Sequence, residues 1–211
     1  MRFSLIYVRA AAFGLLAACG GSIAEIPDAN PKTDSPLDAG AAGAEVLFTE
    51  DPSTWVLAGQ NPDLYALMAT DTAVMRNGKA ATRLSQVGKQ GNPSIPWATA
   101  MSRETKPATS YRGKRIRMRA EMKTENVSDG GWLWLRLDGV GKPLTICNMQ
   151  PHDSADRTLK GTHDFTPMSC VLDVPSSTDA LTFGFGLTGS GDAWIGAVTF
   201  ELVGTDVPIA Q

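Results

Sequence analysis

The sequence predicts an all-β protein built as an antiparallel β-sandwich, and three observations lead to this prediction. Apolar and polar residues alternate with a period of two in several segments, which is the pattern of strands with one buried face. Turn-forming residues separate these segments, and patterns with a helical period are nearly absent. The composition agrees, because the 211 residues include 21 glycines and 13 prolines and only 19% are charged.

The clearest alternation occurs at residues 115–123, 132–138 and 181–188. In these segments Ile and Met alternate with Arg, Glu and Lys, Leu alternates with Trp, Arg and Asp, and Leu and Phe alternate with Thr and Gly. Eight or nine short strands, each with one apolar face, describe a sandwich of two antiparallel sheets. The six further segments expected to be strands are 55–58, 80–84, 97–102, 144–150, 168–174 and 194–203.

Turn chemistry marks the boundaries between these strands. Glycine and asparagine accept the left-handed backbone that tight turns require, and serine and proline favour turn positions. Residues 62–68 are the one segment that favours a short helix, of one or two turns. The predicted turns are Asn77-Gly78, Asp129-Gly130-Gly131, Asp138-Gly139, Pro175-Ser176-Ser177 and Gly189-Ser190-Gly191.

The N-terminus has the features of an export signal. Two arginines flank small and apolar residues, and the stretch AAAFGLLAA forms a short apolar core. The following Leu16-Ala17-Ala18-Cys19 resembles a bacterial lipobox, which implies a diacylglyceryl group on Cys19, although an ordinary cleaved signal also fits the small residues. Gly20 after the cysteine is compatible with sorting to the outer membrane.

The expected organisation therefore has three parts. Residues 1–18 are predicted to be a lipoprotein signal peptide, 19–45 a lipidated flexible tether rich in Pro, Ala, Asp and Gly, and 46–211 the β-sandwich domain. Acyl chains would anchor the protein in the bacterial cell envelope, with the outer membrane as the expected location. The sequence gives no indication of an oligomeric state.

Several function classes are disfavoured by composition and motifs. A formal charge of −3 gives no electrostatic reason to expect nucleic acid as a partner. His152 and His163 match no standard metal-ligand spacing, and no nucleophile elbow is present. We therefore expect no catalytic residues, metal or cofactor, although Glu121 and Asp138 on neighbouring strands would offer a carboxylate pair to a glycosidase.

The predicted sheet carries an unusual set of residues on the face opposite the leucines. Tryptophan rings can stack on sugars, and arginine and aspartate supply directional hydrogen bonds. Glycines at 184 and 186 would let a ligand approach the backbone. The alternative is that residues 46–110 pack across this face. The ligand-binding candidates are Trp132, Trp134, Arg136, Asp138, Arg119 and Gln150.

The order of several motifs resembles a known group of domains. Trp55, Asn77-Gly78-Lys79, Tyr111-Arg112-Gly113-Lys114 and Trp194 are arranged as in jelly-roll carbohydrate-binding modules with a galactose-binding-like fold. Residues 111–203 are similar to a bacterial jelly-roll domain that occurs alone or attached to helix-turn-helix regulators. This resemblance implies a jelly roll that binds a glycan or similar polar small molecule without catalysis. The competing hypothesis is a structural or protein-interaction module of the cell envelope.

Two departures from the pattern have consequences. Gly196 and Ala197 stand where those families place acidic residues that commonly hold calcium, so no calcium site is carried over. Cys147 replaces an aspartate, and together with Cys170 this suggests a disulfide. The register of the hairpin after Asp138 leaves the bond open. A three-residue loop would place Cys147 on the leucine face near Cys170, whereas a two- or four-residue loop would place it beside the tryptophans.

Overall fold

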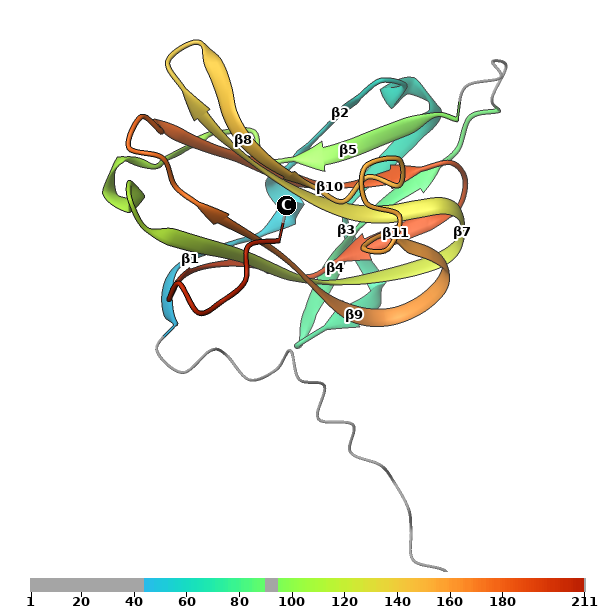
Figure 1. Cartoon of the computed structure of the whole chain (residues 1–211). Coiled ribbons are helices and arrows are strands. Elements are labelled where there is room, and N and C mark those ends of the chain that lie inside the picture. The colour runs from blue at the N-terminus through green and yellow to red at the C-terminus, as the bar shows by residue number, and fades with distance from the viewer. Residues whose placement is uncertain (1–43, 90–94, 211) are drawn as a thin grey trace, which may run out of the picture. The chain divides into compact units, whose positions relative to one another are not determined.

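A computed structural model describes residues 44–89 and 95–210, which form an antiparallel β-sandwich (Figure 1). The signal peptide, Cys19 and nearly all of the tether lie outside these residues. Nowhere in the described ranges is there a helix long and apolar enough to cross a membrane. The described elements are β1 (Glu45–Glu50), η1 (Pro52–Thr54), β2 (Val56–Gly59), η2 (Pro62–Leu64), β3 (Tyr65–Arg76), β4 (Lys79–Gln86), β5 (Trp97–Met101), β6 (Lys106–Pro107), η3 (Thr109–Tyr111), β7 (Arg115–Gly139), β8 (Lys142–Asn148), β9 (Leu159–Asp173), β10 (Ala180–Thr188), β11 (Asp192–Ile195) and β12 (Val198–Val203).

The long strand β7 belongs to both layers of the sandwich, because it bends and continues from one into the other (Figure 1). Its first half pairs with β9, β11 and β12, and β1, β4 and β3 extend this layer, which we call the first sheet. Its second half pairs with β8 and β10, and β5, β6 and β2 extend this second sheet. One strand therefore contributes outward-facing side chains to both sheets.

The core between the sheets is formed by the apolar faces that the alternation predicted. All three leucines of residues 133–137 are fully buried, and so are Leu181, Phe183, Phe185 and Leu187 of β10. The first half of β7 contributes Ile116, Met118 and Met122 from the other side. The side chains that alternate with these residues therefore point away from the core, onto the outer face of each sheet.

Three predictions about local structure are wrong. The segment 194–203 is not one strand, because β11 ends at Ile195 and β12 begins at Val198. Within residues 62–68, which were expected to be helical, Pro62–Leu64 forms a single turn, and the chain from Tyr65 onward is strand β3, which the sequence did not suggest. Tyr65 is buried, and its hydroxyl lies 2.8 Å from the carbonyl oxygens of Pro96 and Gly189 and donates to them, which holds the start of β3 in the sandwich. The predicted turn at residues 129–131 does not end a strand, since β7 passes through it.

The hairpin between β7 and β8 decides the position of Cys147. Its loop has two residues, because Gly139 pairs with Lys142, and this length alone would place Cys147 beside the tryptophans. A bulge between the pairs Asp138↔Pro143 and Leu137↔Thr145 shifts the register by one residue. Cys147 therefore pairs with Leu135 and points into the core.

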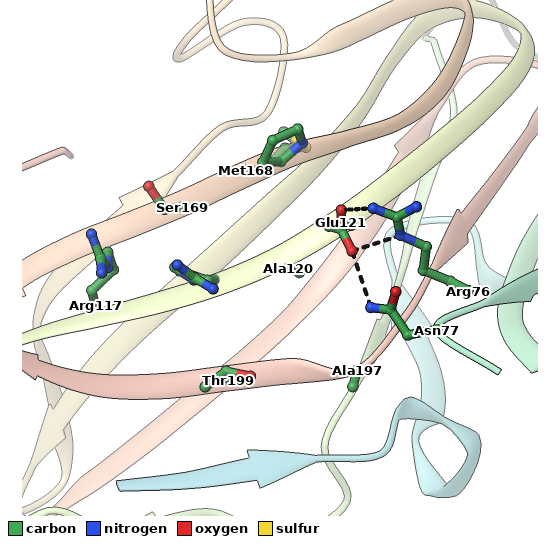
Figure 2. Close-up of a pocket in the computed structure, with 11 residues that line it drawn as sticks. Arg76, Asn77, Arg117, Ala120, Glu121, Met168, Ser169, Ala197 and Thr199 are labelled. Atoms are coloured by element: carbon green, nitrogen blue, oxygen red, sulfur yellow. Dashed lines mark hydrogen bonds and ion pairs between the residues drawn. The ribbon is translucent and has the colours of Figure 1, made fainter. Parts of the chain in front are cut away.

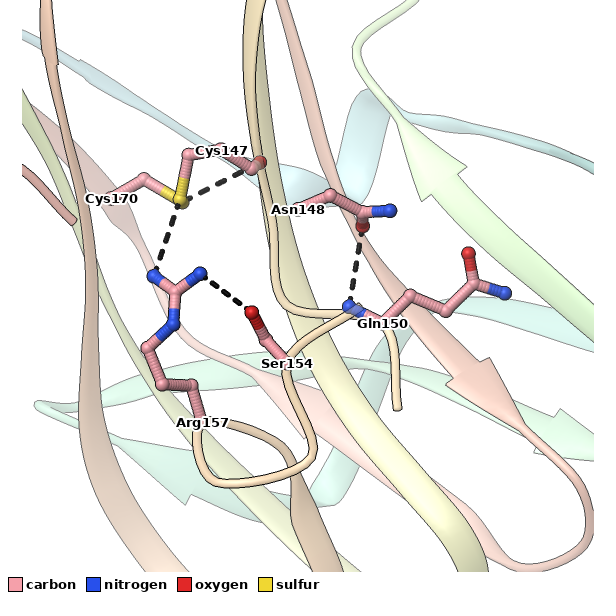
Figure 3. Close-up of a disulfide and its surroundings, with 6 residues drawn as sticks. All are labelled: Cys147, Asn148, Gln150, Ser154, Arg157 and Cys170. Atoms are coloured by element: carbon pink, nitrogen blue, oxygen red, sulfur yellow. Dashed lines mark hydrogen bonds between the residues drawn. A yellow bond between two sulfur atoms is a disulfide. The ribbon is translucent and has the colours of Figure 1, made fainter. Parts of the chain in front are cut away.

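A disulfide joins Cys147 of β8 to Cys170 of β9, with a Cα–Cα distance of 5.8 Å (Figure 3). Both residues are fully buried. Because β8 lies in the second sheet and β9 in the first, the bond crosslinks the two layers at their edge. Arg157 lies beside it, with Nη1 at 3.8 Å from the Cys147 sulfur (Figure 3).

Candidate ligand-binding pocket

The predicted tryptophan face lies on the outer side of the second sheet, but the indoles are not accessible. Trp132 and Trp134 are only 3% and 8% exposed. Their cross-strand neighbours are Gly186 and Gly184, and a methyl group on Gly186 would lie 2.2 Å from the Trp132 ring. The space that these glycines leave is therefore filled by the rings of the protein itself, not by a ligand.

Each indole nitrogen also has a partner within the protein. Trp132 Nε1 donates to Thr188 Oγ1 at 3.0 Å, and Trp134 Nε1 donates to Thr99 Oγ1 at 2.7 Å. Trp97 of β5 packs edge-on against Trp132, with ring centroids 6.0 Å apart. Thr99 and Trp97 belong to β5, a strand of the same sheet, and not to a layer of residues 46–110 packed across the face, which was the alternative that the sequence left open.

The polar residues of the predicted site are separated by the bend in β7. Arg136 and Asp138 remain next to the tryptophans, where Arg136 Nε donates to Asp138 Oδ1 at 2.8 Å and the Arg136 side chain is 40% exposed. Gln150 is almost buried in the segment after β8. Arg119 lies on the outer face of the first sheet, so the expectation that it would join the tryptophans is wrong.

A pocket of about 370 Å³ lies on the outer face of the first sheet (Figure 2). Arg119 is among the residues that line it. The floor of the pocket is the first half of β7, with β9 on one side and β12 on the other. The turn between β3 and β4 closes one end. The lining residues are Arg76, Asn77, Arg117, Arg119, Ala120, Glu121, Pro167, Met168, Ser169, Ala197 and Thr199.

The cross-strand register explains why this surface is hollow. Arg119 stands between Ser169 of β9 and Thr199 of β12. These short side chains leave space above the sheet on both sides of the arginine. Neither hydroxyl forms a side-chain hydrogen bond with another of the residues that the structure describes, so both face the pocket as donors and acceptors.

An ion pair closes the end of the pocket at the β3–β4 turn (Figure 2). Arg76 binds Glu121 through two nitrogens, with Nε at 2.7 Å from Oε2 and Nη2 on Oε1. The Arg76 guanidinium also lies 5.3 Å from the centre of the Phe165 ring. Asn77 and Gly78 have φ angles of 50° and 75°, which makes the predicted tight turn that brings Arg76 to this position.

A buried carboxylate lies at the opposite end. Glu201 of β12 is only 4% exposed and is shared by two arginines. Arg117 Nε donates to Glu201 Oε2 at 2.7 Å, whereas Arg119 Nε lies 3.5 Å from Oε1. Arg117 therefore neutralises most of this charge, and Arg119 is held loosely with 36% of its side chain exposed.

Three groups outside the pocket have shifted pKa values: Tyr65, Asp173 and Arg115, whose pKa is raised by its hydrogen bond to Asp173. The pKa of Tyr65 is raised well above its ordinary value because the hydroxyl is buried. The hydrogen bond from Arg115 lowers the pKa of Asp173 at the end of β9.

His152 pairs with Asp153 and His163 contacts the Lys160 carbonyl oxygen. Across the described ranges, no group of three or more His, Cys, Asp and Glu side chains could hold a metal ion.

Of the ligand-binding candidates that the sequence offered, only Arg119 lines this pocket, and Glu121 was considered only as part of a carboxylate pair with Asp138. The alternation of arginine and glutamate in residues 115–123 was visible, but it is also the pattern of an ordinary solvent-exposed face. Ser169 and Thr199 carry no signal of their own. Arg76 is the last residue of β3, a strand that was not predicted, so its contact with Glu121 had no basis in the sequence.

The chain was compared with known proteins. No protein-family model matches it. Over 154 residues it is 32% identical to an uncharacterized HTH-type transcriptional regulator, YbfP of Bacillus subtilis, and the match covers 73% of this chain and 49% of that protein. The chain thus spans about half the length of this curated relative.

Solved structures with a similar architecture include carbohydrate-binding modules. A xylan-binding domain of family CBM22 matches with a TM-score of 0.50 and 11% identity, over 76% of this chain and 96% of that domain. The CBM22-1 xylan-binding domain of Paenibacillus barcinonensis Xyn10C gives a TM-score of 0.49 and 9% identity over the same shares. At these identities the likeness concerns the fold, and the predicted jelly roll is confirmed.

Proposed function

We propose that this protein is a lipid-anchored envelope protein whose jelly-roll domain binds a carbohydrate or a similar polar small molecule without catalysis. The observation that carries the proposal is the polar pocket around Arg119 on the outer face of the first sheet. Its volume is at the lower end of the range for small-molecule sites. The use of the same fold by xylan-binding domains supports the proposal.

The pocket offers the chemistry that sugar hydroxyls require. Each hydroxyl group both donates and accepts a hydrogen bond, so a sugar site needs partners of both kinds. Arg119 donates, the carboxylate of Glu121 accepts, and the hydroxyls of Ser169 and Thr199 do both. Ala197 adds a small apolar patch to the wall for the carbon atoms of the ring.

The same contacts favour binding over hydrolysis. A glycosidase needs two carboxyl groups that act as acid and as nucleophile or base. In this pocket Glu121 is bound by Arg76, and Glu201 is bound by Arg117 and buried. Neither carboxylate is available for such a role. The related segment in a transcriptional regulator also fits a module that recognises a ligand.

The test compares two arginines that are matched in exposure and lie on opposite faces. Full-length protein in detergent is applied to a glycan array as the wild type and as the variants Arg119→Ala and Arg136→Ala. Both residues pair with one carboxylate and are 36% and 40% exposed. We expect Arg119→Ala to lose retention and Arg136→Ala to keep it. The opposite result would place the ligand on the tryptophan face, and a wild type that retains no glycan would refute the proposal.

The lipid anchor has its own test. In cells expressing the full-length protein, the wild type should fractionate with membranes and Cys19→Ser should not. A conservative Cys19→Ser change removes only the sulfur that would carry the acyl chains. Membrane association that survives this substitution would contradict the anchoring role of Cys19.

A structural module of the envelope is the second candidate, and the burial of the tryptophan face favours it. Trp132 and Trp134 fill the outer side of the second sheet as a packed layer, as expected where no ligand is bound there. This candidate predicts that the full-length protein retains no saccharide of any class. Retention that depends on Arg119 would exclude it as the whole explanation.

A further inference from the structure

The pocket around Arg119 contains more positive than negative charge. Three arginines, at 76, 117 and 119, line it. Two carboxylates oppose them, Glu121 in the lining and Glu201 beneath it. Arg119 has the longest carboxylate contact of the three arginines, 3.5 Å to Glu201, so its positive charge is the least compensated in this partly enclosed site. A neutral sugar does not compensate such a charge, whereas an anionic ligand does.

The uncompensated charge is located on one side chain. The Arg76 guanidinium holds Glu121 through two nitrogens, and Arg117 lies against Glu201 with Nε at 2.7 Å and Nη2 at 2.6 Å from the same oxygen. Arg119 reaches Glu201 only at 3.5 Å, beyond the length of a good hydrogen bond. Its guanidinium is therefore the group with binding capacity left in the pocket.

The surroundings of Arg119 are suited to a planar anion. A guanidinium presents parallel N–H donors that match the two oxygens of a carboxylate. Ser169 and Thr199 stand on either side and can donate hydroxyl hydrogens to the same oxygens. Glu121 at the far end is an acceptor for hydroxyl groups, so the pocket has an anion-binding part and a hydroxyl-binding part.

We infer that the ligand is an acidic saccharide of the uronic acid class, with its carboxylate on Arg119 and its hydroxyls toward Glu121. This inference rests on the proposed function, because it specifies the ligand of the same pocket. The carboxylate would bind where charge is already uncompensated, without breaking the ion pairs of Glu121 or Glu201.

Titration calorimetry on full-length protein in detergent tests this inference. The probes are oligosaccharides of glucuronic or galacturonic acid and the same oligosaccharides as methyl esters, which keep the ring and remove the charge. We expect the acid to bind about 10- to 100-fold more tightly than the ester, the factor for a hydrogen-bonded ion pair. Affinity for the acid should fall several-fold between 50 mM and 500 mM salt, and affinity for the ester should not.

Variants separate this role from a structural one. Arg119→Gln keeps a hydrogen-bonding side chain and leaves Glu201 paired with Arg117, so the fold should be retained, with a melting temperature within about 2 °C of wild type. It should reduce the affinity for the acid to that for the ester. Arg119→Lys should recover only part of the preference, because lysine lacks the planar pair of donors. Arg136→Gln is the matched control and should behave as wild type.

The outcomes distinguish the inference of an acidic ligand from the proposed saccharide-binding function on which it rests. Equal affinity for acid and ester, with binding that still depends on Arg119, would overturn the acidic ligand and leave a neutral saccharide site. Binding of sulfated but not carboxylated oligosaccharides would also overturn the uronic acid class. Binding of no saccharide at all would refute the proposed function, and the inference with it.

Discussion

Replacing Trp134 by alanine tests whether this indole is part of the packed protein or is a surface group that binds a ligand. The indole is 8% exposed, lies over Gly184 and donates to Thr99 Oγ1 at 2.7 Å. Its removal would leave a cavity at the surface of the second sheet and a hydroxyl without its donor. We therefore expect Trp134→Ala to destabilise the domain even though the residue lies on an outer face.

The magnitude follows from burial and from the lost hydrogen bond. Truncation of a buried Phe or Trp to alanine costs about 3–5 kcal/mol. One net hydrogen bond contributes about 1 kcal/mol within that loss. For a domain of this size, 1 kcal/mol corresponds to about 2–4 °C in melting temperature. Trp134→Ala should therefore lower the melting temperature by roughly 6–20 °C.

Thermal unfolding of the full-length protein, followed by circular dichroism, measures this effect. Trp134→Phe is the control, since it keeps an aromatic ring and removes the indole N–H, and it should lose only part of the stability. A surface tryptophan held for a ligand would change stability by less than about 0.5 kcal/mol. An unchanged melting temperature in Trp134→Ala would refute the assignment of this ring to the packed layer.

Two further predictions concern Tyr65 and the Cys147–Cys170 disulfide, which stabilise the sandwich on which the pocket lies. The raised pKa of Tyr65 means that the unfolded state releases its proton first, so this contribution to stability is complete below about pH 10 and is lost as the pH rises further. The melting temperature of wild type should therefore fall between pH 8 and pH 10.5, and the fall should be smaller in Tyr65→Phe, which lacks the ionisable hydroxyl. An equal fall in both proteins would contradict the argument. The Cys147–Cys170 bond closes a 23-residue separation, so replacing both by alanine should cost about 3 kcal/mol, roughly 6–12 °C. Reductant should destabilise wild type and leave the double variant unchanged, and a wild type indifferent to reductant would argue against the bond.

The sequence was sufficient to predict the strands whose alternation is strict. Residues 115–123, 132–138 and 181–188 are strands with the predicted buried faces, because burial on one side of a sheet imposes a period of two. Strand β3 was missed for a physical reason. Its residues are mostly exposed on both sides, and Tyr65 is fixed by carbonyl groups of distant loops, so no local pattern marks it.

The position of Cys147 shows how one β-bulge reverses the face that the length of the hairpin loop alone would predict. The turn at Gly139 has two residues, for which the sequence argument placed the cysteine on the tryptophan face. The bulge after Pro143 adds one residue to β8 and reverses the orientation of everything that follows. The sequence left the register open because it did not give the length of the hairpin loop, and a bulge was not considered. The bulge brings Cys147 into buried contact with Cys170.

The two outer faces of β7 differ because of the residues beside them, not because of the residues on them. In both halves of the strand the outward positions carry large polar or aromatic side chains. Where the neighbours are glycines, as at Gly184 and Gly186, the tryptophans lie flat across the sheet and close the surface. Where the neighbours are Ser169 and Thr199, they are too short to meet above Arg119 and too polar to attract an apolar cover. The size of the cross-strand partner thus determines which face is packed and which is open, and it places the candidate site on the arginines.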